Sequence, residues 1–385
     1  MKFFDVIVLG GGASGCVCAI SARKNRKNVA IIDRENRPAK KILVTGNGRC
    51  NLTNKNMSST FFNQNVDNFL KRFSSEDTIQ FFNEIGLVSY ADDEGRVYPV
   101  SNSAKSVTTV LELALEESKV KFFGETEIES IKKENEKFFI KTNNGEFSSN
   151  KLVYALGGKS IDFAKEAFGI EISPPYASLV ALKTSPTRAL SGNKISNCAV
   201  TLQLPSGEKY KDMGEVLFKD SGLSGICIFN LSAYLARARS FKGTISIDIF
   251  PNKSEKEVEN ILLSRKSLPR KVDQVFDGLL LPAIGYEILN RLKLDESRPL
   301  SSLTGAEISA LAKLIKNLTF EVKGAYDNNQ VFSGGVKLKS LTENLESKKI
   351  SNLYFIGEAC DVDGICGGYN LQWAFTSGKI VGESL

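Results

Sequence analysis

One short stretch near the start of the chain limits the possible folds more than any other. Phe3 to Leu9, FFDVIVL, is the apolar run of a buried strand, and it leads directly into Gly10-Gly11-Gly12-Ala13-Ser14-Gly15. A helix of small residues is predicted over Ala13 to Lys24, and a second strand over Val29 to Ile32 ends at Asp33. This order of strand, glycine turn, helix and strand predicts a parallel βαβ unit, and therefore an α/β fold.

The glycines fit the pattern G-x-G-x-x-G, in which each glycine has a physical reason. The first permits a tight turn, the second lets backbone approach a pyrophosphate, and the third lets the helix pack closely on the strand. Asp33 lies 23 residues beyond Gly10, where an acid can accept hydrogen bonds from a ribose diol. The alternative, a glycine turn used only for packing, leaves that spacing as coincidence. The stretch predicts a dinucleotide site; Asp33 argues against NADP, and the motif alone leaves FAD or NAD open.

Composition narrows the class of protein. With 385 residues, 42% hydrophobic and 24% charged, the chain is typical of a soluble protein of two or three domains. The net charge of +6 comes without a basic block, which disfavours nucleic acid as a partner. Histidine is absent, which excludes Ser-His-Asp and Cys-His catalysis and His-ligated metals, so no metal site is expected.

The cysteine content and the longest apolar run indicate in which cellular compartment the protein is expected. The seven cysteines are an odd number and form no CxxC, which favours reduced thiols and a cytoplasmic location. No signal peptide is evident. The nearly uncharged run Val6 to Ala22 is short for a membrane span and contains several glycines, so a strand, turn and buried helix explain it better and no membrane partner is expected.

Two further glycine clusters follow predicted strands. Lys151 to Gly158 reads KLVYALGG, and Leu353 to Glu358 reads LYFIGE. The second cluster precedes a glycine-rich loop, and a helix is predicted over Ala374 to Ser384. A C-terminal strand ending in Gly-acid, followed by a helix aimed at the flavin, is typical of two-part FAD domains of the glutathione-reductase type. The positive end of such a helix would stabilise negative charge at N1 and C2=O of a reduced flavin.

Two longer stretches resemble a known family. TGNGRCNLTN, at Thr45 to Asn54, and GEACDVDGICGGYNLQWAFTSG, at Gly357 to Gly378, are similar to the HI0933-like flavoproteins. That family includes aminoacetone-oxidase-like and bile-acid-reductase-like NAD(P)/FAD-dependent oxidoreductases. GLSG at Gly222 to Gly225 and GGV at Gly334 to Val336 extend the resemblance along the chain. It implies that the Thr45 to Asn54 loop runs along the pyrophosphate toward the flavin. From the residues alone, a surface loop of turn-forming asparagines is equally favoured.

The sequence departs from the family pattern at three places. Asn47 stands where the family has glycine, although asparagine tolerates the left-handed conformation. Cys360 stands where the family often has leucine, which puts a second thiol near Cys366. After Gly158-Lys159-Ser160 the chain enters a predicted helix, Asp162 to Phe168, where the family has a longer glycine-rich segment. The last departure predicts that one wall of the flavin site is missing or rebuilt.

The motif and the resemblance together give a set of candidate residues. The catalytic group stays unknown: Cys50 and Cys366 are weak redox candidates for which burial as small residues is favoured, and Tyr369 is a weak proton donor for which packing is favoured. The expected cofactor contacts are Gly10, Gly12, Ala13, Ser14, Gly15, Asp33, Arg34, Lys41, Thr45, Gly46, Gly48, Arg49, Cys50, Asn51, Ile128, Ala155, Gly157, Gly158, Gly357, Glu358, Asp361, Gly368, Asn370, Leu371 and Gln372.

The middle of the chain predicts two inserted subdomains. Short strands are expected at Ala199 to Leu204, Glu215 to Phe218 and Thr244 to Ile249, with a helix over Asn230 to Arg239. Residues 254–317 have helical periodicity, broken by prolines. The expected domains are residues 1–182 and 326–385 for FAD binding, 183–250 for a β-rich insert and 251–325 for a helical insert. Such inserts form a substrate site or, alternatively, only oligomer contacts; oligomerisation is left open.

These observations predict an FAD-dependent oxidoreductase with a small-molecule substrate. NAD(P)H or a small organic donor would reduce the flavin, and an unidentified acceptor such as an activated alkene or a quinone would reoxidise it. No second G-x-G-x-x-G marks a nicotinamide domain, so NAD(P)H enters only as a transient co-substrate. Two alternatives stay open: an FAD-dependent RNA-modifying protein and a non-catalytic flavin-binding regulator.

Overall fold

The computed structural model describes residues 1–185, 187–327 and 330–385, and these fall into two compact units. The first unit joins two segments of the chain, Met1–Tyr176 and Gln330–Leu385, and the second is Ala177–Asn329. Each unit has its own hydrophobic core. The predicted division into four domains stays a prediction.

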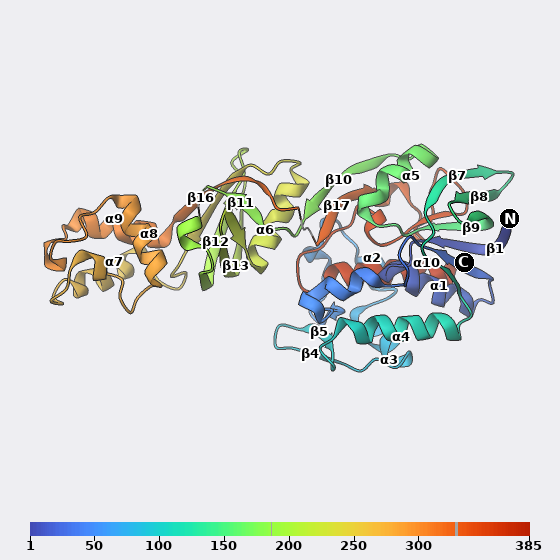
Figure 1. Cartoon of the computed structure of the whole chain (residues 1–385), viewed down its shortest axis with the longest axis horizontal. Coiled ribbons are helices and arrows are strands. Elements are labelled where there is room, and N and C mark those ends of the chain that lie inside the picture. The colour runs from blue at the N-terminus through green and yellow to red at the C-terminus, as the bar shows by residue number, and fades with distance from the viewer. Residues whose placement is uncertain (186, 328–329) are drawn as a thin grey trace. The chain divides into compact units, whose positions relative to one another are not determined.

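The first unit is built on a mainly parallel sheet of seven strands in the described residues (Figure 1). Its strand order is β6-β2-β1-β9-β8-β7, and β18 adds to β9. The bounds are β1 Lys2–Leu9, β2 Val29–Ile32, β6 Lys121–Phe123, β7 Ile128–Glu134, β8 Lys137–Thr142, β9 Gly145–Tyr154 and β18 Leu353–Phe355. β1 carries Val6 to Leu9 fully buried between β2 and β9, which is why it reads as a continuous apolar run. The predicted strands and helix of the βαβ unit are confirmed.

The strand β9 explains how two distant parts of the sequence share one sheet. It pairs with β1 in parallel along one side. On the other side its first half pairs with β8, and its second half, Leu152 to Tyr154, pairs with β18. The carboxyl ends of β1, β9 and β18 therefore lie at the same edge, which is where α/β sheets bind ligands.

Other elements of the first unit surround this sheet. A small sheet has the order β3-β5-β4, and β10 pairs with β17. The bounds are β3 Thr53–Asn54, β4 Ser89–Ala91, β5 Arg96–Pro99, β10 Ile172–Ser178, β17 Val331–Val336, α2 Asp67–Leu70, α3 Ser75–Glu84, α4 Ala104–Glu117 and α5 Ile161–Phe168.

Helices α1 (Ala13–Lys24) and α10 (Tyr369–Ser384) pack side by side, as Figure 1 shows. A Cβ on Gly378 would lie 2.4 Å from the Ser14 carbonyl oxygen, and one on Gly382 would lie 2.5 Å from that of Cys18. Because these two residues are glycines, the backbones of α1 and α10 can pack in direct contact. The predicted start of this last helix at Ala374 is wrong: the helix begins at Tyr369, because Gly368, with φ +97°, makes the turn into it.

The second unit contains a closed antiparallel barrel with the strand order β11-β14-β13-β12-β15-β16. Its strands are β11 Leu182–Thr184, β12 Lys194–Gln203, β13 Lys209–Lys219, β14 Gly222–Ser224, β15 Gly243–Asp248 and β16 Leu318–Ala325. The helices are α6 Ile226–Arg237, α7 Glu255–Arg265, α8 Pro282–Leu292 and α9 Gly305–Lys316. The predicted capping box of Thr304 and Glu307 opens α9. β16 begins directly after residues 254–317, the stretch with helical periodicity, and its alternating residues return the chain to the barrel.

Candidate functional site

The three motif glycines differ in the space that surrounds them. A Cβ on Gly10, whose φ is +99°, would lie 2.5 Å from the Ala155 carbonyl oxygen, and one on Gly15 would lie 2.0 Å from that of Gly10. Both positions exclude any side chain because the obstructing atoms are backbone. A Cβ on Gly12, by contrast, would meet nothing within 4 Å. The middle glycine therefore opens into free space at the start of α1, as a backbone that receives a ligand requires.

That free space lies at the positive end of α1. Gly12 is the N-cap residue and makes no side-chain capping bond, and the first turn carries no acid. The first N–H groups of a helix have no partner within it. Together with the helix dipole, they form a site that attracts phosphate. The arrangement fits a dinucleotide pyrophosphate.

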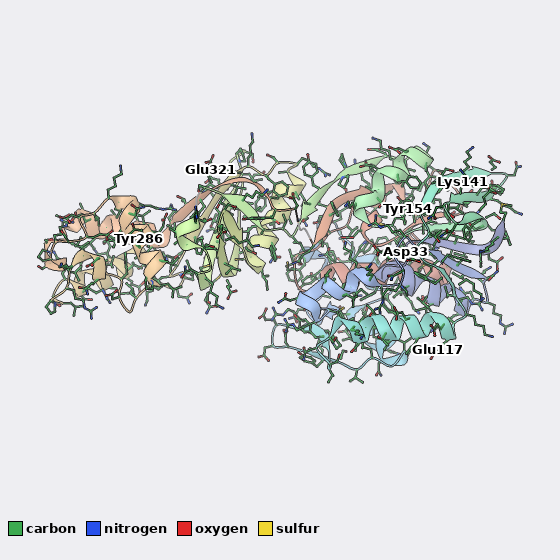
Figure 2. All side chains as sticks on the ribbon, in the orientation of Figure 1. Asp33, Glu117, Lys141, Tyr154, Tyr286 and Glu321 are labelled. Carbon is green, nitrogen blue, oxygen red and sulfur yellow. The ribbon has the colours of Figure 1, made fainter. Side chains whose placement is uncertain are left out.

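Asp33, labelled in Figure 2, is held in place at the end of β2 by two backbone N–H groups. Its Oδ2 accepts from Gly11 N at 2.5 Å, and its Oδ1 accepts from Glu35 N at 2.9 Å. The Thr126 N–H donates to the Asp33 carbonyl at 2.9 Å, which brings the start of β7 at Ile128 to this end of the site. Arg34 is mostly exposed and faces Glu35 at 3.8 Å. This corner has the acid and partly apolar surface that an adenosine requires.

The loop that follows Ile42 has an unusual backbone. Gly46, Asn47, Gly48 and Cys50 all have φ between +54° and +81°. The prediction that Asn47 tolerates the left-handed conformation is confirmed by its φ of +59°. The Thr45 hydroxyl donates to Ile42 O at 2.7 Å, and Cys50 N–H donates to Thr45 O at 3.1 Å, which close the turn. A Cβ on Gly48 would meet nothing within 4 Å, so this loop also presents open backbone.

The same loop is tied to the start of α10. With the Asn51 amide oriented to satisfy its neighbours, its nitrogen donates to Thr53 O at 2.9 Å and its oxygen accepts from Gly368 N at 3.1 Å. Arg49 lies with its guanidinium 4.6 Å from the centre of the Tyr98 ring, a cation–π contact. Asn370 holds the preceding turn by accepting from Gly364 N and donating to Gly364 O, both at 2.9 Å.

The N-termini of α1 and α10 lie at different positions along their shared axis direction. Ser14 and Cys18 of α1 face Gly378 and Gly382 of α10, so the helices run parallel. α1 begins one residue before Ser14, whereas α10 begins nine residues before Gly378. At 1.5 Å per residue, the start of α10 lies roughly 12 Å beyond that of α1. Two positive helix ends spaced in this way suit the pyrophosphate and the ring of an extended FAD.

A third group of candidates lies at the ends of β9 and β18, next to the start of α1. The Lys41 ammonium forms an ion pair with Glu358 Oε2 at 2.6 Å. A Cβ on Gly157 would lie 3.5 Å from the same oxygen, and one on Gly357 would lie 2.6 Å from Ser14 Oγ. Gly158 is packed on Phe332 of β17, whose Cβ would be 2.7 Å from a Cβ there. β17 therefore occupies the place next to the shortened segment after Gly158.

Some candidate residues are hydrogen-bonded to, or packed against, other parts of the first unit. Gln372 is buried, accepts from the Thr53 hydroxyl at 2.6 Å and donates to Ser74 O at 3.0 Å. Asp361 accepts from Ser173 Oγ at 2.7 Å. Ala13 and Leu371 are partly buried against the core. These residues position the walls of the groove, and their predicted contacts with a cofactor stay predictions.

Sequence reasoning missed the residues that fix the end of β18. Ser377 Oγ accepts from Gly357 N at 2.9 Å, and Trp373 Nε1 donates to Gly357 O at 3.0 Å. Both side chains come from α10, one and two turns after its start. Trp373 and Ser377 are four residues apart, but the predicted helix began only at Ala374, so neither their common helix face nor their shared partner could be read from the sequence.

The three weak catalytic candidates differ in exposure. Cys50 is buried, and burial raises the pKa of its thiol to about 12. Tyr369 is buried beside Phe61, with ring centres 4.7 Å apart, and burial also raises its pKa. Cys366 is partly exposed. Cys360 is buried, and its thiol donates to Phe355 O at 3.2 Å. The geometry thus favours packing for Cys50 and Tyr369.

The buried thiols predict a loss of stability in alkali. Burial raises the pKa of Cys16 to about 12 and of Cys198 to about 11, and it also raises the pKa of Cys18. In the unfolded chain thiols ionise near pH 8.5, so above that pH the unfolded state binds fewer protons and is favoured. Their contribution is complete below about pH 8.5 and is lost as the pH rises toward the folded values, by about 1.4 kcal/mol per pH unit for each thiol.

Urea unfolding at pH 7.5 and pH 10 measures this loss. Cys18→Ala should have a shallower decline than the parent protein, because one raised pKa is removed. An equal decline in both proteins would contradict the assignment to thiols.

Among the described residues, no group of three histidine, cysteine, aspartate or glutamate side chains could hold a metal ion. In the same part of the chain, no helix is both long and apolar enough to cross a membrane.

The parallel sheet, the glycine cradle and the two displaced helix ends define a Rossmann-type FAD-binding fold. The chain belongs to the HI0933-like family: the HI0933-like protein Rossmann domain matches residues 4–384.

Comparisons with individual proteins cover nearly the whole chain. It is 31% identical over 402 residues to the 3-dehydro-bile acid delta(4,6)-reductase of Clostridium scindens, with 98% of each chain covered. It is 28% identical over 400 residues to the ribosomal RNA dihydrouridine synthase of Haemophilus influenzae, with 98% of this chain and 97% of the relative covered. The 3-ketosteroid delta1-dehydrogenase structure from Sterolibacterium denitrificans aligns over 100% of this chain and 99% of that chain, at 12% identity and a TM-score of 0.53, and shows the fold alone.

Proposed function

We propose that this chain is an FAD-dependent reductase of a carbon–carbon double bond conjugated to a carbonyl. The observation that carries the proposal is a chemical feature shared by the names of two relatives. A delta(4,6)-reductase of a 3-keto bile acid and a dihydrouridine synthase both saturate a carbon–carbon double bond next to a carbonyl group. The two substrates differ in size and charge, so the common factor is the reacting group.

FAD, when bound and reduced, would supply a hydride for the double-bond carbon farther from the carbonyl, and a proton would complete the neighbouring carbon. The residues of the chain bind and orient it. The start of α1 at Gly12 would hold the pyrophosphate, and Asp33 would accept hydrogen bonds from the ribose hydroxyls. The positive end of α10, at Tyr369, would stabilise the negative charge of a reduced ring. The Asn51 amide keeps the loop and that helix end together.

We propose NAD(P)H as the electron donor, so that NAD(P)H, a proton and the alkene give NAD(P)⁺ and the saturated product. The free cysteines suit a reducing compartment, and we propose the cytoplasm. The substrate is either a small enone or a uracil ring in RNA. The bile-acid reductase favours the first and the dihydrouridine synthase favours the second.

Anaerobic visible spectra of the FAD-loaded protein test the proposal. The oxidised flavin bands should bleach on addition of NADPH or NADH and return when a 3-keto-4-ene steroid or a uridine-containing RNA is added. A flavin that both nicotinamides leave oxidised would contradict a reductase and favour an organic electron donor or a non-catalytic regulator. Bleaching without recovery by either acceptor would exclude both substrate classes.

A further inference from the structure

The net charge of the chain is concentrated in the second unit. Residues 177–329 contain 21 lysines and arginines against 16 aspartates and glutamates, a net charge of +5 out of +6 for the whole chain. The first unit, which contains the dinucleotide groove, is therefore close to neutral. An excess of positive charge confined to one unit indicates a partner with negative charge at that unit.

Two of these cations share one aromatic ring on the barrel. The Lys219 ammonium lies 5.0 Å from the centre of the Tyr326 ring, and the Lys183 ammonium lies 5.6 Å from it. The Tyr326 hydroxyl is hydrogen-bonded to Ser221 Oγ at 2.9 Å. These four residues come from β11, from the end of β13 and from the segments after β13 and β16. We call them the Lys–Tyr cluster.

In the part of the chain that the structure describes, the two ammonium groups of the cluster form no ion pair with an acid. Within the described residues neither Lys183 nor Lys219 has a carboxylate oxygen within 4.0 Å, whereas Lys194 pairs with Glu215 at 2.8 Å. Asp220, the sequence neighbour of Lys219, instead accepts from Ser191 Oγ at 2.5 Å. The positive charge of the cluster is therefore available to an external anion.

Lys183 is the exposed lysine of the cluster. Its two cross-strand neighbours are Gly222 of β14 and Gly324 of β16, which carry no side chains, and the Tyr326 ring lies against Gly222. The Lys183 side chain can therefore meet a ligand from solvent beside the Tyr326 ring.

We propose that the Lys–Tyr cluster is a binding site for the phosphodiester backbone of single-stranded RNA. Each ammonium group can bind phosphate oxygens, and the hydroxyl of the Ser221–Tyr326 pair that does not donate within the pair can donate a further hydrogen bond. The charge excess of the unit adds long-range attraction. The inference rests on the proposed function only in naming the RNA as the substrate that carries the reducible uracil.

Fluorescence anisotropy with a labelled, uridine-containing single-stranded RNA tests the site. The double variant Lys183→Met/Lys219→Met should bind about tenfold more weakly than the parent protein in 50 mM salt. The dependence of log K on log salt concentration should become shallower by about 1.4, because two phosphate contacts are lost. Lys209→Met/Lys211→Met, which removes the same charge from exposed positions on β13, is the matched control and should lose no more than about threefold.

Each result decides the inference. Equal losses in the two double variants would show general attraction by the unit and overturn the cluster as a site. No RNA binding by the parent protein would overturn it too. Flavin bleaching by NADPH is recorded on the same samples and should be unchanged in both variants, so RNA binding without bleaching would refute the proposed function while leaving this inference standing.

Discussion

Gly12→Arg should abolish FAD binding and leave the fold of both units intact. A side chain at Gly12 meets no protein atom within 4 Å, so the substitution causes no internal clash. The arginine would instead fill the space at the start of α1 that the pyrophosphate needs, and steric exclusion outweighs its attraction to phosphate. Dissociation constants from flavin fluorescence quenching should rise by at least a hundredfold, with an unchanged midpoint of urea unfolding for the cofactor-free protein.

Gly305→Arg is the matched control. Gly305 is the first residue of α9 in the second unit, and a Cβ there also meets nothing within 4 Å. This variant should retain full FAD binding. Normal FAD occupancy in Gly12→Arg would refute the placement of the cofactor at α1.

Gly378→Val should destabilise the first unit by about 3 kcal/mol, near the upper end of the range for overpacked cores. Its Cβ would lie 2.4 Å from the Ser14 carbonyl oxygen, which is backbone and cannot turn away. Helix propensity alone would favour valine over glycine by a few tenths of a kcal/mol, so the sign of the effect separates the two causes. Urea unfolding followed by the fluorescence of Trp373, the only tryptophan, measures the change in the first unit.

The variant should also weaken FAD binding, because separating α1 from α10 moves the two helix ends apart. Gly305→Val again serves as the control: there the open surroundings predict a neutral or slightly stabilising effect. A Gly378→Val protein as stable as the parent would contradict the close contact of the two helices.

The sequence predicts the first βαβ unit well because its causes are local. The strand before Gly10, the helix after Ala13 and the acid at Asp33 all lie within one βαβ unit, and the structure shows each in the expected place. The Rossmann-type fold with β-rich and helical inserts is also confirmed. It could be predicted because each helix and strand has its own hydrophobic periodicity. The left-handed Asn47 likewise follows from a residue-level preference.

The remaining features depend on contacts between distant segments. Hydrophobic periodicity predicted that the last helix begins at Ala374. It gives no sign that the chain already enters the helix after Gly368, about one and a half helical turns earlier. The side chains of Trp373 and Ser377 have a shared partner in Gly357, which lies on a different element. The expected helical insert, residues 251–325, includes the strand β16, because the pairing partners of β16, β11 and β15, lie far away in the sequence.

The divided pairing of β9 has a consequence for protein synthesis. The second half of β9 gains its outer neighbour only from β18, and the groove gains its second helix end only from α10. Both elements come after the whole second unit in the chain, and domains generally fold in the order in which the ribosome makes them. The barrel and its helices can therefore be complete while the expected flavin site is still open on one side, and we expect FAD to bind only after α10 has been made.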